Sequence, residues 1–136
     1  MVLEGHMVLR HEGHHAASLG PYDQDRFDGG WTTHSRGRAR DFNLMCADGV
    51  EGDLATFRIP GRDTCFESVE AVSTGLAWLA LYCVDGDMIL CDRSDRAHLR
   101  TGQLLLAEAS RLAPGLRIEN LRDQTGVLIR CSIRTR

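Results

Sequence analysis

The clearest structural signal in the sequence is the segment Gly126-Val127-Leu128-Ile129-Arg130-Cys131-Ser132-Ile133-Arg134. Its odd-numbered residues from Val127 to Ile133 are all apolar, whereas Arg130, Ser132 and Arg134 are polar. Successive side chains of a strand point to opposite faces, so this period of two predicts a half-buried antiparallel strand.

Seven further segments also predict strands, namely residues 2–10, 39–46, 52–59, 77–84, 87–91, 103–108 and 116–120. Turn signals such as Gly20-Pro21, Asp48-Gly49, Pro60-Gly61 and Pro114-Gly115 separate them. About eight short strands with regular turns predict an all-β barrel or sandwich.

Two segments leave the type of element open. Residues 64–73 fit a short helix as well as a strand. Residues 104–113 end at Pro114-Gly115, which would suit a helix stop. We favour a strand for residues 104–108, because this apolar run directly follows a Thr-Gly turn.

Composition narrows the class of protein. The chain has 136 residues, which suits one domain or two very small ones. Its net charge is -3, which argues against a general nucleic-acid partner. Its longest apolar run, residues 76–84, is too short to cross a membrane, and no signal peptide opens the chain. The five cysteines are odd in number and lack C-x-x-C spacing, which favours a reducing cytoplasm over a secreted disulfide framework.

Histidines gather near the amino terminus as His6, His11, His14 and His15. The string His11-Glu12-Gly13-His14-His15 fits H-E-x-x-H, which binds zinc when a helix places both histidines on one face. Here the preceding residues predict a strand and Gly13 weakens a helix, so we expect a solvated hairpin turn. A metal site of another kind remains an alternative.

Residues 3–9 and 84–90 resemble each other, with Gly, Met and Leu in matching places. This match predicts a duplicated unit of strand, hairpin turn and strand, with the turns at Glu4-Gly5 and Asp85-Gly86. Chance agreement between two β segments is the alternative. If the repeat is real, the first copy lacks the opening strands that precede the second.

The string Arg40-Asp41-Phe42-Asn43-Leu44-Met45 resembles the R-D-F-N-x-M signature of the HutD/Ves family. Residues 2–9, the Phe27-Asp28-Gly29 run and residues 81–108 resemble other parts of that family, whose usual amino-terminal segment is missing here. The resemblance implies a cupin-like β-barrel with two lobes. It also implies a regulatory or metabolite-sensing role beside histidine-degrading enzymes, or a stress role in the Ves branch, without an established catalytic mechanism. We therefore expect one compact unit over 1–136, in which 1–35 is a remnant of a first cupin-like unit and 36–136 forms a second.

For the site we predict no catalytic residue, no cofactor and no metal, because the H-x-H core of metal-binding cupins is absent. If residues 40–46 form a strand, Asp41, Asn43 and Met45 share one face, and Phe42, Leu44 and Cys46 the other, apolar one. The candidate ligand-binding residues are Trp31, His34, Arg40, Asp41 and Asn43. A structural role for Asp41 and Asn43, and a plain surface loop for Trp31 and His34, are the alternatives. The basic run of residues 36–40 would attract an anion.

Three functions follow as hypotheses. The first is a cytoplasmic, non-catalytic protein that binds a small anionic metabolite, such as urocanate or N-formylglutamate, and forms a homodimer. The second is an interaction module that completes its barrel by dimerisation. The third is a metal-dependent cupin enzyme.

Overall fold

The computed structural model describes residues 1–68, 75–93, 95–112 and 115–135. The chain divides into two compact units, Met1–Asn43 and Leu44–Arg136. The sequence placed a boundary after residue 35. Residues 36–41 belong with the first unit because they continue a strand that pairs with its opening segment.

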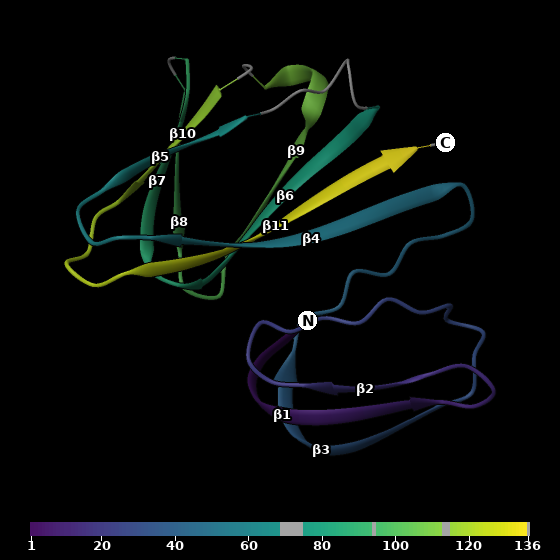
Figure 1. Ribbon diagram of the computed structural model, residues 1–136. Helices are drawn as coiled ribbons and strands as arrows, with labels where there is room; N and C mark the ends of the chain where they lie inside the picture. Colours follow the sequence, from purple (N-terminus) through teal and green to yellow (C-terminus); the bar gives the residue numbers. More distant parts are fainter. Residues whose placement is uncertain (69–74, 94, 113–114, 136) are drawn as a thin grey trace. The chain divides into compact units, whose positions relative to one another are not determined.

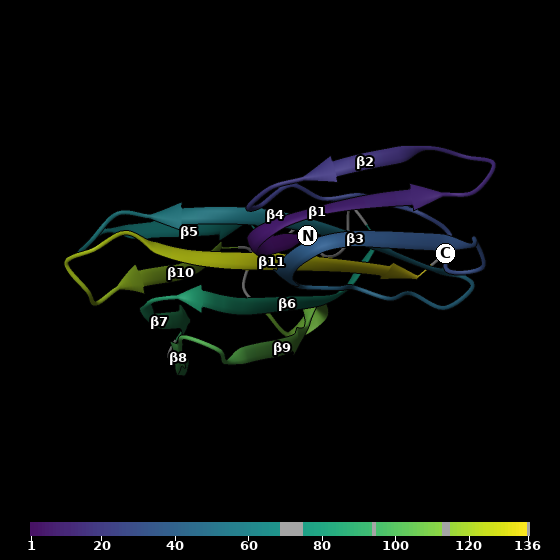
Figure 2. The same cartoon turned by 90° about the horizontal axis from the view of Figure 1, so that it is seen from below.

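The first unit is a three-stranded antiparallel sheet (Figures 1 and 2). Its strands are β1 (Val2–His11), β2 (Ala16–Leu19) and β3 (Thr33–Asp41), in the order β2-β1-β3. Val2, Leu9 and Leu19 form its buried apolar cluster. A loop from residue 20 to residue 32 connects β2 to β3, and the bonds Tyr22 N–H to Val2 C=O and Val2 N–H to Asp23 C=O tie it to β1.

The second unit contains two four-stranded antiparallel sheets (Figure 1). One has the order β5-β10-β7-β8 and the other β4-β11-β6-β9. Their bounds are β4 (Val50–Ile59), β5 (Thr64–Ser68), β6 (Leu76–Asp85), β7 (Asp87–Asp92), β8 (Asp95–Arg100), β9 (Leu104–Glu108), β10 (Gly115–Asn120) and β11 (Gly126–Thr135). A 3-10 turn, η1 (Ala109–Arg111), follows β9. Eight strands in two packed antiparallel sheets make a cupin-like sandwich, which confirms the predicted all-β class.

Both sheets contribute to the core of the second unit. Leu79, Leu81 and Leu128 come from one sheet, and Met88 and Ile118 from the other. All five side chains are at most 2% exposed. No helix among the residues described is long and apolar enough to span a membrane.

β11 is a strand as predicted, but it is not half-buried. It lies between β4 and β6, and Leu128 and Ser132 are buried as well as Ile129 and Cys131. Leu128 and Ser132 lie on the same face of β11 as Arg130. The guanidinium carbon of Arg130 lies 5.3 Å from the centre of the Phe57 ring. A central strand in a sandwich is covered on one face by the other sheet, so a polar residue on that face does not mean exposure.

Neither of the two expected hairpin turns is present. β1 continues through Glu4 and Gly5, where the pairing with β3 shifts register and Gly5 has φ +79°. At Gly86, with φ +150°, the chain passes from β6 in one sheet to β7 in the other. In both places an acidic residue and glycine mark a backbone irregularity and not a hairpin.

Several other boundaries differ from the expectation. The strand expected over residues 39–46 ends at Asp41. Burial still alternates beyond it, with Phe42 and Leu44 partly buried and Asn43 and Met45 exposed, but Cys46 is exposed and does not lie on an apolar face as expected. Thr64–Ser68 is a strand, and residues 69–73 of that ambiguous segment lie outside the described residues. The strand favoured for 104–108 is confirmed. β2 and β8 were not predicted.

Candidate functional site

The turn between β1 and β2 places two histidines side by side. Arg10 pairs with Ala16 across the hairpin, and the next residues, His11 and His15, are joined by a bond from His11 N–H to His15 C=O of 2.8 Å. Gly13 has φ +75°, which the tight turn requires and most side chains disfavour. A hairpin, and not a helix, therefore brings the i and i+4 histidines together.

Both imidazoles meet the carboxylate of Asp25, which comes from the loop after β2. His11 Nε2 lies 2.9 Å from Asp25 Oδ2, and His15 Nε2 lies 3.0 Å from Asp25 Oδ1. The His11 side chain is fully buried, that of Asp25 is 13% exposed, and that of His15 is 42% exposed. The three side chains therefore form one cluster that is open to solvent on the His15 side.

Hydrogen bonds around the cluster fix its orientation. His11 Nδ1 lies 2.8 Å from Thr33 Oγ1, and the Arg26 N–H donates to Asp25 Oδ1 at 2.9 Å. Burial raises the pKa of the Asp25 carboxyl, but hydrogen bonds from His11 and His15 outweigh it and hold that pKa below its usual value. The carboxylate is thus kept ionised between two imidazoles.

Aromatic rings form a wall beside these three residues. The Trp31 ring stacks on His14 with centroids 3.6 Å apart and meets His11 edge-on at 5.7 Å. Phe27 lies 4.4 Å from His11 by ring centroids. We call His11, His14, His15, Asp25 and Trp31 the histidine cluster.

Glu12 does not face the histidine cluster. Its carboxylate pairs with His34 Nε2 at 2.7 Å on the other side of the sheet. The general base of an H-E-x-x-H zinc protease therefore has no counterpart here, in line with the prediction of a hairpin turn. The expectation of a solvated turn was wrong for His11, which is 2% exposed.

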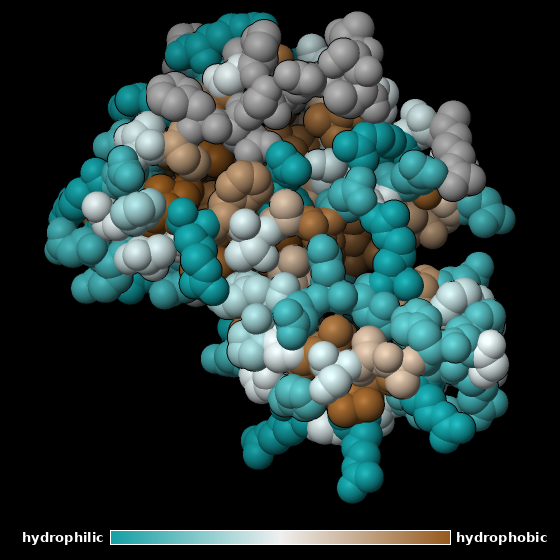
Figure 3. All heavy atoms as spheres, in the orientation of Figure 1, coloured by the Kyte–Doolittle hydropathy of each residue, from teal (hydrophilic) through white to brown (hydrophobic). Residues whose placement is uncertain are grey.

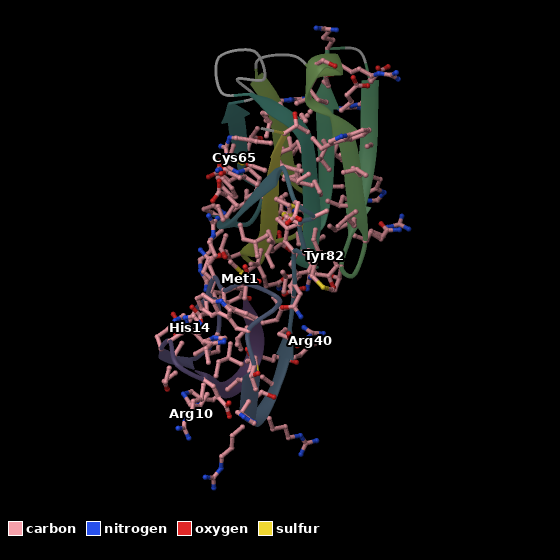
Figure 4. The ribbon with its side chains drawn as sticks, turned by 90° about the vertical axis from the view of Figure 1, so that its right-hand side faces the viewer. Met1, Arg10, His14, Arg40, Cys65 and Tyr82 are labelled. Carbon is pink, nitrogen blue, oxygen red and sulfur yellow. The ribbon has the colours of Figure 1, made fainter. Side chains whose placement is uncertain are left out.

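The opposite face of the three-stranded sheet is basic. The cross-strand pairs are Arg40 with Glu4, Arg38 with His6, Arg36 with Val8 and His34 with Arg10, and paired residues share a face. We call His6, Arg10, His34, Arg36, Arg38 and Arg40 the basic face. All six are exposed, and long hydrophilic side chains extend from the first unit in Figure 3. Figure 4 shows His14 and Arg40 on opposite sides of this unit.

Two of the six basic-face residues have a carboxylate partner. Arg40 pairs with Glu4 at 3.5 Å and His34 with Glu12 at 2.7 Å. Within the described ranges, Arg10, Arg36 and Arg38 form no ion pair. Three guanidinium groups on this face are therefore available to an anion from solution.

The residues predicted to bind a ligand do not converge. Trp31 belongs to the histidine cluster, whereas His34 and Arg40 lie at opposite ends of β3, about 20 Å apart at the rise of a strand. Asn43 Nδ2 donates to Asp41 Oδ2 at 2.8 Å. Both residues follow Arg40, the last residue of the basic face in the sequence. Asp25 was missed, since it lies ten and fourteen residues from its partners and no spacing rule points to it.

Comparisons with known proteins identify the family. The HutD family model matches residues 1–125. No curated protein sequence matches the chain. The structure resembles PA5104 from Pseudomonas aeruginosa PAO1, described as a conserved protein of unknown function, with 21% identity and a TM-score of 0.74 over 98% of this chain and 68% of that one.

It also resembles HutD from Pseudomonas fluorescens SBW25, with 18% identity and a TM-score of 0.64 over 100% of this chain and 66% of that one. At such identities the likeness shows the fold alone, and the chain spans about two thirds of the length of these two proteins. Since the family model covers most of the sequence, the predicted resemblance is confirmed and the chain belongs to the HutD family.

Proposed function

We propose that this HutD-family chain is a non-catalytic cytoplasmic protein that binds a small anionic metabolite in a regulatory role linked to histidine utilisation. The observation that carries the proposal is the basic face, with its row of cationic side chains along β3. Membership of the HutD family supports the link to histidine utilisation.

The chemistry of the basic face favours a carboxylate ligand. Arg36 and Arg38 share one face of β3, about 7 Å apart along the strand, with His6 and Arg10 on the neighbouring strand. A guanidinium group binds a carboxylate through two parallel hydrogen bonds, so adjacent arginines can hold one carboxylate each. A compact dicarboxylate such as N-formylglutamate, or an imidazole carboxylate such as urocanate, has the matching charge.

Thermal unfolding with added ligand tests this proposal. Urocanate or N-formylglutamate, at about 100 times its dissociation constant, should stabilise the fold by about 2.7 kcal/mol. The double variant Arg36→Ala/Arg38→Ala should lose this stabilisation, whereas Arg62→Ala on the second unit should keep it. Arg62 is a suitable control because it is also an exposed arginine, 2.9 Å from Asp123.

Two results would contradict the proposal. One is a wild-type protein whose melting temperature does not respond to either ligand. The other is a double variant that responds as strongly as wild type, because binding would then not use the basic face.

Dimerisation is a second candidate, favoured by the open sheet of the first unit. β2 and β3 are the two outer strands of that sheet, and outer strands offer backbone groups to a partner. A homodimer would complete the sheet by strand pairing. Analytical ultracentrifugation should then show a dimer at micromolar concentration, and a monomer at all accessible concentrations would refute it.

A further inference from the structure

The histidine cluster gathers metal-binding atoms that the proposed function does not use. One nitrogen each from His11 and His15 and one oxygen of Asp25 lie within 4.8 Å of one another. We propose that these three side chains bind a divalent transition-metal ion such as Zn²⁺. This inference goes beyond the proposed function and contradicts the sequence-based expectation of no metal.

The donor set suits such an ion. Zinc takes imidazole nitrogen and carboxylate oxygen at about 2.0 to 2.2 Å, which separates two ligand atoms of a tetrahedron by roughly 3.4 Å. In the structure the Asp25 oxygens lie 2.9 and 3.0 Å from the two Nε2 atoms. Opening these two contacts by about half an ångström, on a loop and at a hairpin turn, would bring the Asp25 oxygens to the ligand separation of a zinc site.

The hydrogen bonds around His11 fit the metal-bound form. When Nε2 binds a metal, the proton of a neutral imidazole lies on Nδ1. The Nδ1–H of His11 can then donate to Thr33 Oγ1 at 2.8 Å, while the Thr33 hydroxyl donates to the Trp31 carbonyl at 3.3 Å. Every donor in this series of hydrogen bonds therefore has an acceptor. When the ion binds, each neutral imidazole exchanges the Nε2–H tautomer, which directs its proton at Asp25, for the Nδ1–H tautomer, so that Nε2 can bind the metal.

The surroundings also resemble those of a bound ion. The Arg26 N–H holds one Asp25 oxygen, and the rings of Phe27 and Trp31 cover one side of the site. His15 is 42% exposed, so an ion and a fourth ligand from solution can reach it. Three protein ligands with an open fourth position are typical of a zinc site that binds a further ligand.

Calorimetric titration of the full chain, without a histidine tag, with Zn²⁺ tests the inference. We expect one ion per chain with a low-micromolar or tighter dissociation constant. His15→Ala and Asp25→Asn should each weaken binding by at least about 100-fold, the upper end of what loss of an outer-shell partner costs. His6→Ala and His34→Ala are matched controls, because both side chains lie on the basic face, and they should bind as wild type.

A spectroscopic readout separates a lost ligand from a misfolded variant. Zn²⁺ should shift the imidazole Nε2 resonances of His11 and His15 in the wild-type protein, and leave those of His6 and His98 in place. It should also change the fluorescence of Trp31, whose ring lies 5.7 and 5.9 Å from the two imidazoles by centroids. Absence of binding, binding that survives both ligand variants, or Nε2 shifts confined to other histidines would each overturn the inference.

Discussion

Replacing Asn120 should destabilise the second unit more than its small side chain suggests. Asn120 is 1% exposed and lies where β10 ends. Its Nδ2 donates toward the carbonyls of Ile59, Pro60 and Gln124 at 3.1, 3.2 and 2.9 Å, and its Oδ1 accepts from Arg122 N–H at 3.0 Å. The side chain thus joins the end of β4 to the loop between β10 and β11.

The magnitude follows from the hydrogens available. An amide nitrogen has two, so the three carbonyl contacts amount to two bonds, and the accepted bond makes three. At a net value of about 1 kcal/mol per hydrogen bond, Asn120→Ala should cost about 3 kcal/mol. The other asparagine, Asn43, has an exposed side chain bonded to Asp41, so Asn43→Ala should cost less than about 0.5 kcal/mol.

Urea unfolding followed by Trp78 fluorescence measures this difference. Trp78 lies in the second unit, and a Trp31→Phe background removes the signal of the first. A loss below about 1 kcal/mol for Asn120→Ala would show that water replaces these bonds and would refute the reasoning.

Asn120→Asp provides a further check through pH. It replaces a donor by an acceptor among three carbonyls, and burial raises the pKa of the new carboxyl. A raised pKa in the folded state makes the variant lose stability as pH rises above the unfolded value, so the deficit should shrink as the pH falls from 7 to 5.

Three further outcomes are expected. Leu128→Ala should cost about 3 to 5 kcal/mol in urea unfolding, because the side chain is 0% exposed in the core, whereas Leu106→Ala at 55% exposure should cost less than about 1 kcal/mol. A maleimide should label the exposed Cys46 in the native protein at pH 7, whereas Cys131 should react only after unfolding; burial raises its pKa to about 11, so raising the pH to 9 should not release it. Gly5→Ala should cost more than about 2 kcal/mol, because φ is +79° and the new Cβ would lie 2.2 Å from a carbonyl oxygen on β3; unchanged thermal stability would contradict this.

The strands with strong alternation were predictable, and their partners were not. Residues 116–120 and 127–134 carry a period of two that identifies a strand at any position in the fold, whereas residues 77–84 are an unbroken apolar run. A glycine after an acidic residue indicates an unusual backbone angle. At Gly5 this angle belongs to a bulge in β1, and at Gly86 it belongs to the passage of the chain from one sheet to the other. Which of these forms depends on distant strands that a local pattern does not contain.

The candidate site was likewise predictable only where it depends on a local strand pattern. Strand parity correctly separates His6 from His11, since they lie an odd number of residues apart on β1 and face opposite sides. The burial of His11 depends on the loop that carries Asp25 and Phe27, and this loop has no period to analyse. The basic residues of β3 were visible in the sequence. That Arg10 and His6 lie beside them follows only from the register between β1 and β3.

The place of β11 in its sheet has a consequence for synthesis of the chain on the ribosome. β11 bonds to both β4 and β6, although four strands and η1 separate it from β6 in the sequence, and six strands and η1 separate it from β4. Until Gly126–Thr135 has left the exit tunnel, β4 and β6 lack the neighbour that joins them. The nascent second unit therefore exposes apolar strand edges through most of its translation, a period in which chaperone binding would protect it from aggregation.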